Sequence, residues 1–121
     1  MRKKLVVVAV VLGLFVTGTG VAQAWDMIHD KSGHGRVTLR AWTRNYNQVA
    51  YVAEHAGTRV WVTIRVRCES GYSFDKRWSD GGDRFRFILR HLGNDGQCNH
   101  TFKVEAKKSG PELDLTLWAR G

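Results

Sequence analysis

The chain has 121 residues, of which 43% are hydrophobic and 25% charged, and its formal net charge is +8 at pH 7. Arg2, Lys3 and Lys4 supply three of these charges, so residues 25–121 carry 16 basic and 11 acidic groups, a net charge of +5. This excess favours contact with anionic polymers through long-range attraction. The length after residue 24, together with the absence of a repeat, a linker or a low-complexity tract, excludes a multidomain chain and predicts one domain over 25–121.

The first 24 residues have the pattern of an export signal. Their basic start is followed by an apolar run over 5–16 and by Ala22-Gln23-Ala24, a small-residue cleavage site. A membrane-spanning helix needs about 20 apolar residues, more than this run offers. We therefore expect a signal peptide over 1–24 and a soluble mature chain that begins at Trp25 and is secreted to the extracellular space or the periplasm.

The rest of the sequence alternates apolar and polar residues with a period of two, and no window of helical length shows an apolar stripe. The alternation predicts an all-β domain, a single small antiparallel β-sandwich or barrel. Its expected strands are 36–44, 48–53, 58–68, 84–92, 98–107 and 113–120.

Asp95-Gly96 lies between 84–92 and 98–107 and is a common sequence for a two-residue type I′ turn. The turn predicts that 84–92 and 98–107 form a hairpin. In that register the facing pairs are His91 with His100, Leu89 with Phe102, Phe87 with Val104, and Arg86 with Glu105.

In most of the expected strands, apolar residues recur at every second position, and these apolar residues form the expected core. Its members are Val37, Leu39, Ala41, Val60, Val62, Ile64, Val66, Cys68, Phe85, Phe87, Leu89, Cys98, Phe102, Val104, Ala106, Leu113, Leu115, Leu117 and Ala119. Cys68 and Cys98 are the only cysteines, and export favours a disulfide between them. Because both have inward parity, we expect an intersheet disulfide, in an outline similar to an immunoglobulin-type sandwich.

The alternate positions of these strands, which are expected to face outward, are rich in arginine and tryptophan. Its members are Arg36, Arg40, Trp42, Arg44, Arg59, Trp61, Arg65, Arg67, Arg84, Arg86, Arg90, Trp118 and Arg120. Cationic side chains beside exposed aromatic rings suit an anionic glycan, a cell-surface polymer or a single-stranded nucleic acid, whereas cross-strand Arg–Trp pairs could equally stabilise a solvated sheet. The first interpretation predicts a secreted, non-enzymatic binding module whose ligand residues are Arg40, Trp42, Trp61, Arg65, Arg67, Trp78 and Trp118.

Residues 69–83 form the longest predicted loop, with Tyr72, Phe74 and Trp78 expected to pack against the end of the sandwich. A second hypothesis makes this loop the recognition element of an interaction or inhibitor domain for an extracellular protein, with Trp78 as the anchor. Asp75, Asp80 and Asp83 could gather calcium ligands, but their spacing is not that of an EF-hand.

Histidine offers a third hypothesis, a small secreted hydrolase that uses the predicted His91–His100 pair. Two imidazoles do not make a zinc site, and the sequence has no phosphate loop, serine-nucleophile motif, HExxH helix or reactive cysteine. Binding is therefore favoured over catalysis, with no cofactor and no metal expected. Nothing in the sequence predicts an oligomeric state.

Overall fold

The computed structural model describes residues 24–108 and 110–121. The predicted signal peptide, apart from Ala24, lies outside these residues. None of the described residues belongs to a helix that could span a lipid bilayer.

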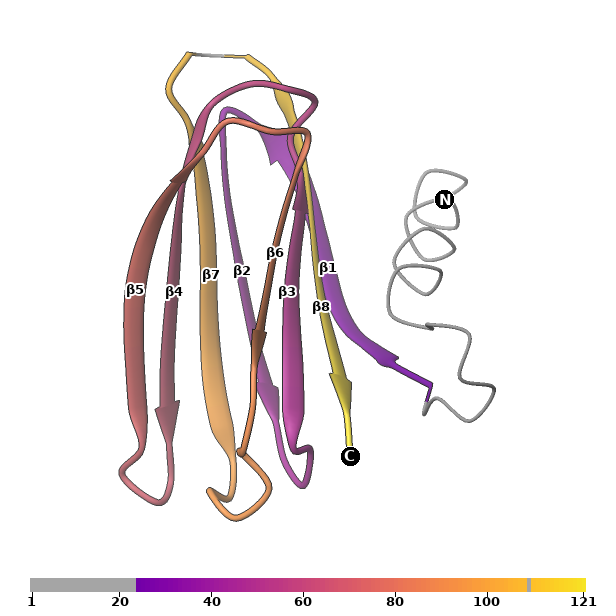
Figure 1. Cartoon of the computed structure of the whole chain (residues 1–121), viewed down its shortest axis with the longest axis vertical. Helices are drawn as coiled ribbons and strands as arrows, with labels where there is room; N and C mark the ends of the chain where they lie inside the picture. Colours follow the sequence, from indigo (N-terminus) through magenta and orange to yellow (C-terminus); the bar gives the residue numbers. More distant parts are fainter. Residues whose placement is uncertain (1–23, 109) are drawn as a thin grey trace.

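Over the described residues, eight strands form two four-stranded antiparallel sheets that pack face to face (Figure 1). Sheet A has the order β1-β8-β3-β6 and sheet B the order β2-β7-β4-β5. The strands are β1 (Asp26–His34), β2 (Arg36–Thr43), β3 (Gln48–Glu54), β4 (Val60–Cys68), β5 (Ser73–Asp80), β6 (Arg84–Leu89), β7 (Cys98–Ala106) and β8 (Glu112–Arg120). The predicted all-β sandwich is confirmed.

The connections between strands correct the immunoglobulin-like outline. Consecutive strands lie in opposite sheets at every step except β4 to β5, which form a hairpin within sheet B. Two interleaved four-stranded sheets of this order make a double-sheet jelly roll, in contrast to the immunoglobulin order, which keeps its first two strands in one sheet. Alternation reports which face of a strand is buried but not which neighbour it pairs with, so it could not distinguish the two topologies.

Two strands were missing from the predicted set, and both lie at sheet edges. β1 includes Gly33 and several polar residues, while β5 contains Asp75, Lys76, Arg77 and Asp80. Charges on an edge strand discourage pairing with another chain, and they also hide the strand from a search for alternating apolar residues.

The predicted hairpin at Asp95-Gly96 is wrong, because β6 belongs to sheet A and β7 to sheet B. Residues 90–97 instead cross from one sheet to the other. The crossing is held by Leu92, whose N–H donates to Asn47 O over 3.0 Å, and by Asp95, whose N–H donates to Leu92 O over 3.1 Å. Of the two turn residues only Gly96 has a positive φ, of 72°, whereas a type I′ turn requires one at both central residues.

The predicted core is confirmed: every residue assigned to it is buried in, or packs against, the cluster between the two sheets. The structure adds β3, in which Val49 through Ala53 are buried, and His100 on the inward face of β7. A second, small cluster of Trp25, Ala50, Val52 and Trp118, with Ile88 packed against it, involves the opposite parity of β3 and β8 in sheet A.

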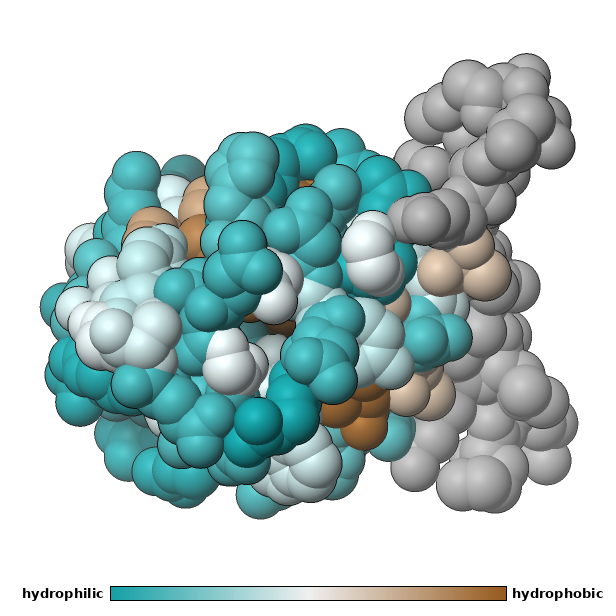
Figure 2. Space-filling model, turned by 90° about the horizontal axis from the view of Figure 1, so that it is seen from below, coloured by the Kyte–Doolittle hydropathy of each residue, from teal (hydrophilic) through white to brown (hydrophobic). Residues whose placement is uncertain are grey.

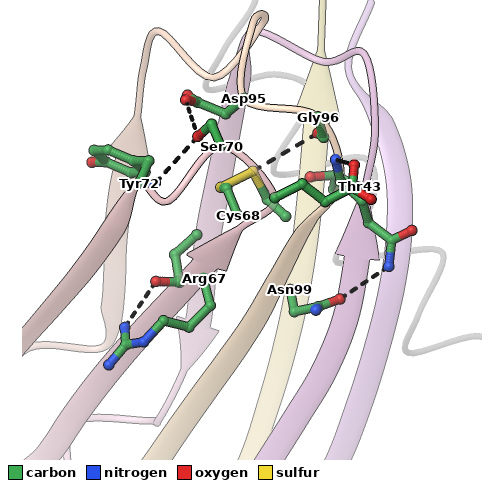
Figure 3. Close-up of a disulfide and its surroundings, with 12 residues drawn as sticks. Thr43, Arg67, Cys68, Ser70, Tyr72, Asp95, Gly96 and Asn99 are labelled. Carbon is green, nitrogen blue, oxygen red and sulfur yellow. Dashed lines mark hydrogen bonds between the residues drawn. A yellow bond between two sulfur atoms is a disulfide. The ribbon is translucent and has the colours of Figure 1, made fainter.

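The Cys68–Cys98 disulfide is confirmed, with an S–S distance of 2.00 Å (Figure 3). Its expected position between the sheets is wrong, because Cys68 and Cys98 face each other on the neighbouring strands β4 and β7 of sheet B. Two cysteines can both point toward the core whether they lie in the same sheet or in opposite sheets. The alternation of buried and exposed residues therefore does not tell which strands a disulfide joins.

Candidate ligand-binding face

The outer face of sheet B presents four rows of side chains across β2, β7, β4 and β5. In that strand order the rows are Arg36, Glu105, Trp61 and Ser79; Thr38, Lys103, Thr63 and Arg77; Arg40, Thr101, Arg65 and Asp75; and Trp42, Asn99, Arg67 and Ser73. Six of these residues are basic and two are acidic. We call this set the sheet B face.

Five of the seven predicted ligand residues, Arg40, Trp42, Trp61, Arg65 and Arg67, lie together on the sheet B face. The other two lie elsewhere. Trp118 is in sheet A, 1% exposed, and Trp78 turns inward from β5 to contact Phe85 and Phe87, with ring centroids 5.2 and 4.9 Å apart. Arg84, Arg86 and Arg120 are also in sheet A, so the arginine-rich parity divides between two sheets.

Two carboxylates of the sheet B face form ion pairs with four of its cations. Glu105 pairs with Arg36 at 2.9 Å and with Lys103 at 3.5 Å. Asp75 pairs with Arg65 at 3.0 Å and with Arg67 at 2.9 Å. Hydrogen bonds from Arg67 and then Arg65 hold the pKa of Asp75 below its usual value, so the acidic groups stay ionised and leave a net positive face.

Arg40 stands apart from these pairs. Its side chain has no hydrogen bond or ion pair with any residue in 24–108 or 110–121. An exposed guanidinium without a protein partner keeps its donors available for an anion.

The two tryptophans of the sheet B face differ in what covers them. The Trp61 ring has Arg77 and Lys107 over it, each 4.2 Å from the ring centroid. Trp42 is 59% exposed. Trp61 therefore holds two cations in place, while Trp42 is the ring that is open to a ligand.

A groove of about 470 Å³ lies beside Trp42, where the edge strands β1 and β2 of the two sheets meet. Its walls include Ile28, His29, Arg40, Trp42, Arg44 and Tyr46. Sequence reasoning missed three of these, because Ile28 and His29 belong to the unpredicted β1 and Tyr46 to the β2–β3 connection. No pattern in the sequence places those segments beside β2.

The predicted 69–83 recognition loop is corrected by the structure, which places most of it in β5. Phe74 and Trp78 face the core, with the Phe74 ring stacked on Phe87 at 5.5 Å between centroids. The three aspartates do not gather: Asp75 pairs with arginines and Asp80 with His55 at 2.6 Å. Within the described residues no group of three side chains could hold a metal ion.

The predicted His91–His100 pair is also wrong, because His91 follows β6 of sheet A and His100 lies within β7 of sheet B. His91 is exposed in the crossing between β6 and β7, whereas His100 is 1% exposed. Its Nε2 lies 2.8 Å from Thr43 Oγ1 and its Nδ1 lies 2.6 Å from Tyr51 Oη. Burial lowers the pKa of His100 to about 4, so it is a neutral, hydrogen-bonded core residue rather than part of an exposed catalytic pair.

No protein-family model and no curated protein sequence matches the chain. Similar solved structures include Pseudomonas aeruginosa AlgX, at 16% identity and a TM-score of 0.52 over 79% of this chain and 27% of that one. The C-terminal domain of A223, a structural protein of Sulfolobus turreted icosahedral virus, matches at 7% identity and a TM-score of 0.50 over 80% and 99%. TmCBM61 in complex with β-1,4-galactotriose matches at 12% identity and 0.48 over 79% and 66%. At identities this low, the matches to AlgX and to the A223 domain show a shared fold alone.

Proposed function

We propose that this protein is an exported binding module for an anionic glycan or cell-surface polymer, which it contacts through the sheet B face. The observation that carries the proposal is the combination of six basic side chains with two acidic ones on a single sheet, next to the exposed ring of Trp42. Export is supported by the N-terminal pattern and by the disulfide, which forms in oxidising compartments.

The dimensions of the sheet B face suit an extended ligand. Trp42 and Trp61 are two strands apart and six residues apart along β4, which corresponds to about 10 Å across the sheet and about 20 Å along it. A flat surface of this size, with cations distributed along it, would bind repeated negative charges weakly at each point and firmly over several.

The test compares a double variant that lacks two cations of the sheet B face with a double variant that lacks two cations from other parts of the molecule. Arg65→Ala with Lys103→Ala should weaken binding to an immobilised polyanionic glycan at least tenfold, and binding by the unaltered protein should fall steeply as salt is added. Arg86→Ala with Arg90→Ala removes the same charge from sheet A and the β6–β7 crossing and should have little effect.

Equal losses in the two double variants would show that net charge alone drives binding and would contradict the proposal. Binding that is insensitive to salt, or equal for a neutral glycan, would contradict it as well.

A further inference from the structure

The groove beside Trp42 is built differently from the flat sheet B face. Its lining residues include Arg44 and Tyr46 of the β2–β3 connection. Figure 1 shows this connection at the same end of the sandwich as the β4–β5 and β6–β7 connections. This end of the molecule is largely hydrophilic, with a few hydrophobic residues showing (Figure 2). A concave site with aromatic walls at such an end is the usual form of a small-ligand site rather than of a polymer track.

A β-bulge shapes one wall of the groove. The pairing of β1 with β8 shifts between Met27, which faces Trp118, and His29, which faces Leu117. The extra residue is Ile28, and both Ile28 and His29 line the groove. A bulge changes the direction of side chains at a strand edge, and here it brings two consecutive residues of sheet A toward β2.

The charges around the groove are unevenly distributed. Arg40 and Arg44 line it with His29, and among the residues that the structure describes no acidic side chain lines it. Two carboxylates contact residues that line the groove, and each is engaged there: Asp26 accepts a hydrogen bond from Tyr46 Oη over 3.1 Å, and Glu69 pairs with Arg44 at 3.1 Å. Arg40 is the cation left with its donors available inside the groove.

We propose that this groove is a subsite for one anionic sugar residue, a pyranose ring bearing a carboxylate or a sulfate. The inference rests on the proposed function and names the chemistry recognised at one end of the face. The apolar face of the ring lies on Trp42, against Ile28 and Tyr46, and the acid group contacts the Arg40 guanidinium. Arginine matches a planar carboxylate with two parallel hydrogen bonds, while a sulfate offers three oxygens. A volume of about 470 Å³ fits one or two rings rather than a long chain.

Short ligands test the groove separately from the sheet B face. Titration calorimetry of the protein would compare methyl glucuronide, glucose 6-sulfate and neutral methyl glucoside. The first two sugars distinguish recognition of a carboxylate from recognition of a sulfate. At least one anionic sugar should bind at least tenfold more tightly than the neutral one. Trp42→Ala should reduce that affinity at least tenfold, and Arg40→Gln should remove the preference for the charged sugar.

Tyr72→Ala is the matched control, because Tyr72 is an aromatic residue 36% exposed outside the groove lining. Equal binding of charged and neutral sugars, or unchanged affinity in Trp42→Ala, would overturn the subsite. The proposed function fails separately: anionic sugars that bind the groove while polymer binding ignores Arg65 and Lys103 would retain the subsite and reject the face. Polymer binding that depends on Arg65 and Lys103, without anionic-sugar binding at Trp42, would retain the sheet B face as a binding surface and reject the subsite.

Discussion

His100 is a candidate catalytic residue in the sequence and a buried core residue in the structure. On β7 it lies between Thr43 of sheet B and Tyr51 of sheet A, with one hydrogen-bonding partner at each ring nitrogen. A neutral imidazole has one donor and one acceptor, and two hydroxyl groups satisfy both. Burial also raises the pKa of Tyr51 well above its usual value, so both side chains remain uncharged and link the two sheets through the core.

This burial predicts a loss of stability in mild acid. The pKa of His100 falls from its usual 6.5 to about 4 on folding, so between these values the unfolded chain binds a proton that the folded chain does not. The free energy of unfolding should therefore decrease as the pH falls from about 6.5 to about 4, by about 3 kcal/mol from this residue. Urea denaturation across this range measures the effect.

His100→Gln keeps a donor and an acceptor but does not titrate, so its free energy of unfolding should depend less on pH than that of the unaltered protein. Comparing the two proteins cancels the contributions of the carboxylates. Parallel pH profiles would show that His100 is not the group responsible.

At the scale of elements, the disulfide joins strands that the sheet already pairs. β4 and β7 are the central strands of sheet B, and Cys68 and Cys98 end their shared ladder. Beside the bridge, Ser70 Oγ donates to Asp95 Oδ1 over 2.6 Å and connects the β4–β5 turn to the β6–β7 crossing (Figure 3). The bridge therefore fastens one end of the sheet, close to the groove.

Removing the disulfide should weaken the fold, because the unfolded chain then gains conformational entropy that the bridge had withheld from it. Cys68→Ala with Cys98→Ala frees a 31-residue loop and should lower the free energy of unfolding by about 3 to 4 kcal/mol in the chain-entropy estimate. Urea denaturation of the double variant and of the reduced native protein should give similar values. A loss below about 1 kcal/mol in both would contradict this expectation.

At the scale of the whole molecule, the crossing of residues 90–97 decides which side chains share a face. With β6 and β7 in one hairpin, Arg86 would lie beside Glu105, and the arginines of β6 would share a sheet with those of β2 and β4. In the jelly roll, Arg86 faces Val52 in sheet A and Glu105 faces Arg36 and Trp61 in sheet B. The positive charge is thus divided between opposite sides of the sandwich.

Interstrand backbone NOEs test this topology directly. We expect NOEs between Val52 and Arg86 and between Arg65 and Thr101, because each pair is adjacent across a ladder. NOEs between Arg86 and Glu105 should be absent. Their presence would restore the hairpin and merge the two arginine groups.

Much of this protein can be predicted from local physics. Alternation in 60–68 and 113–119 predicts strands and assigns their buried side chains, since successive residues of a strand point to opposite faces. Because the chain is expected to be exported and has two cysteines, the sequence predicts one disulfide between them. The alternation also placed Arg40, Trp42, Trp61, Arg65 and Arg67 on the outward side of their strands. Their position on one face depends on β2 and β4 joining the same sheet, which alternation does not predict.

Strand partners and long-range contacts depended on tertiary structure. Asp95-Gly96 has the chemistry of a tight turn, yet competing pairings place β6 against β3 and β7 between β2 and β4. Trp118 and Trp78 share their sequence character with Trp42, and only the packing of distant strands buries one, turns another inward and leaves the third exposed. The groove joins a bulged edge of one sheet to an edge of the other, a contact that no local pattern encodes because its energy comes from residues far apart in the chain.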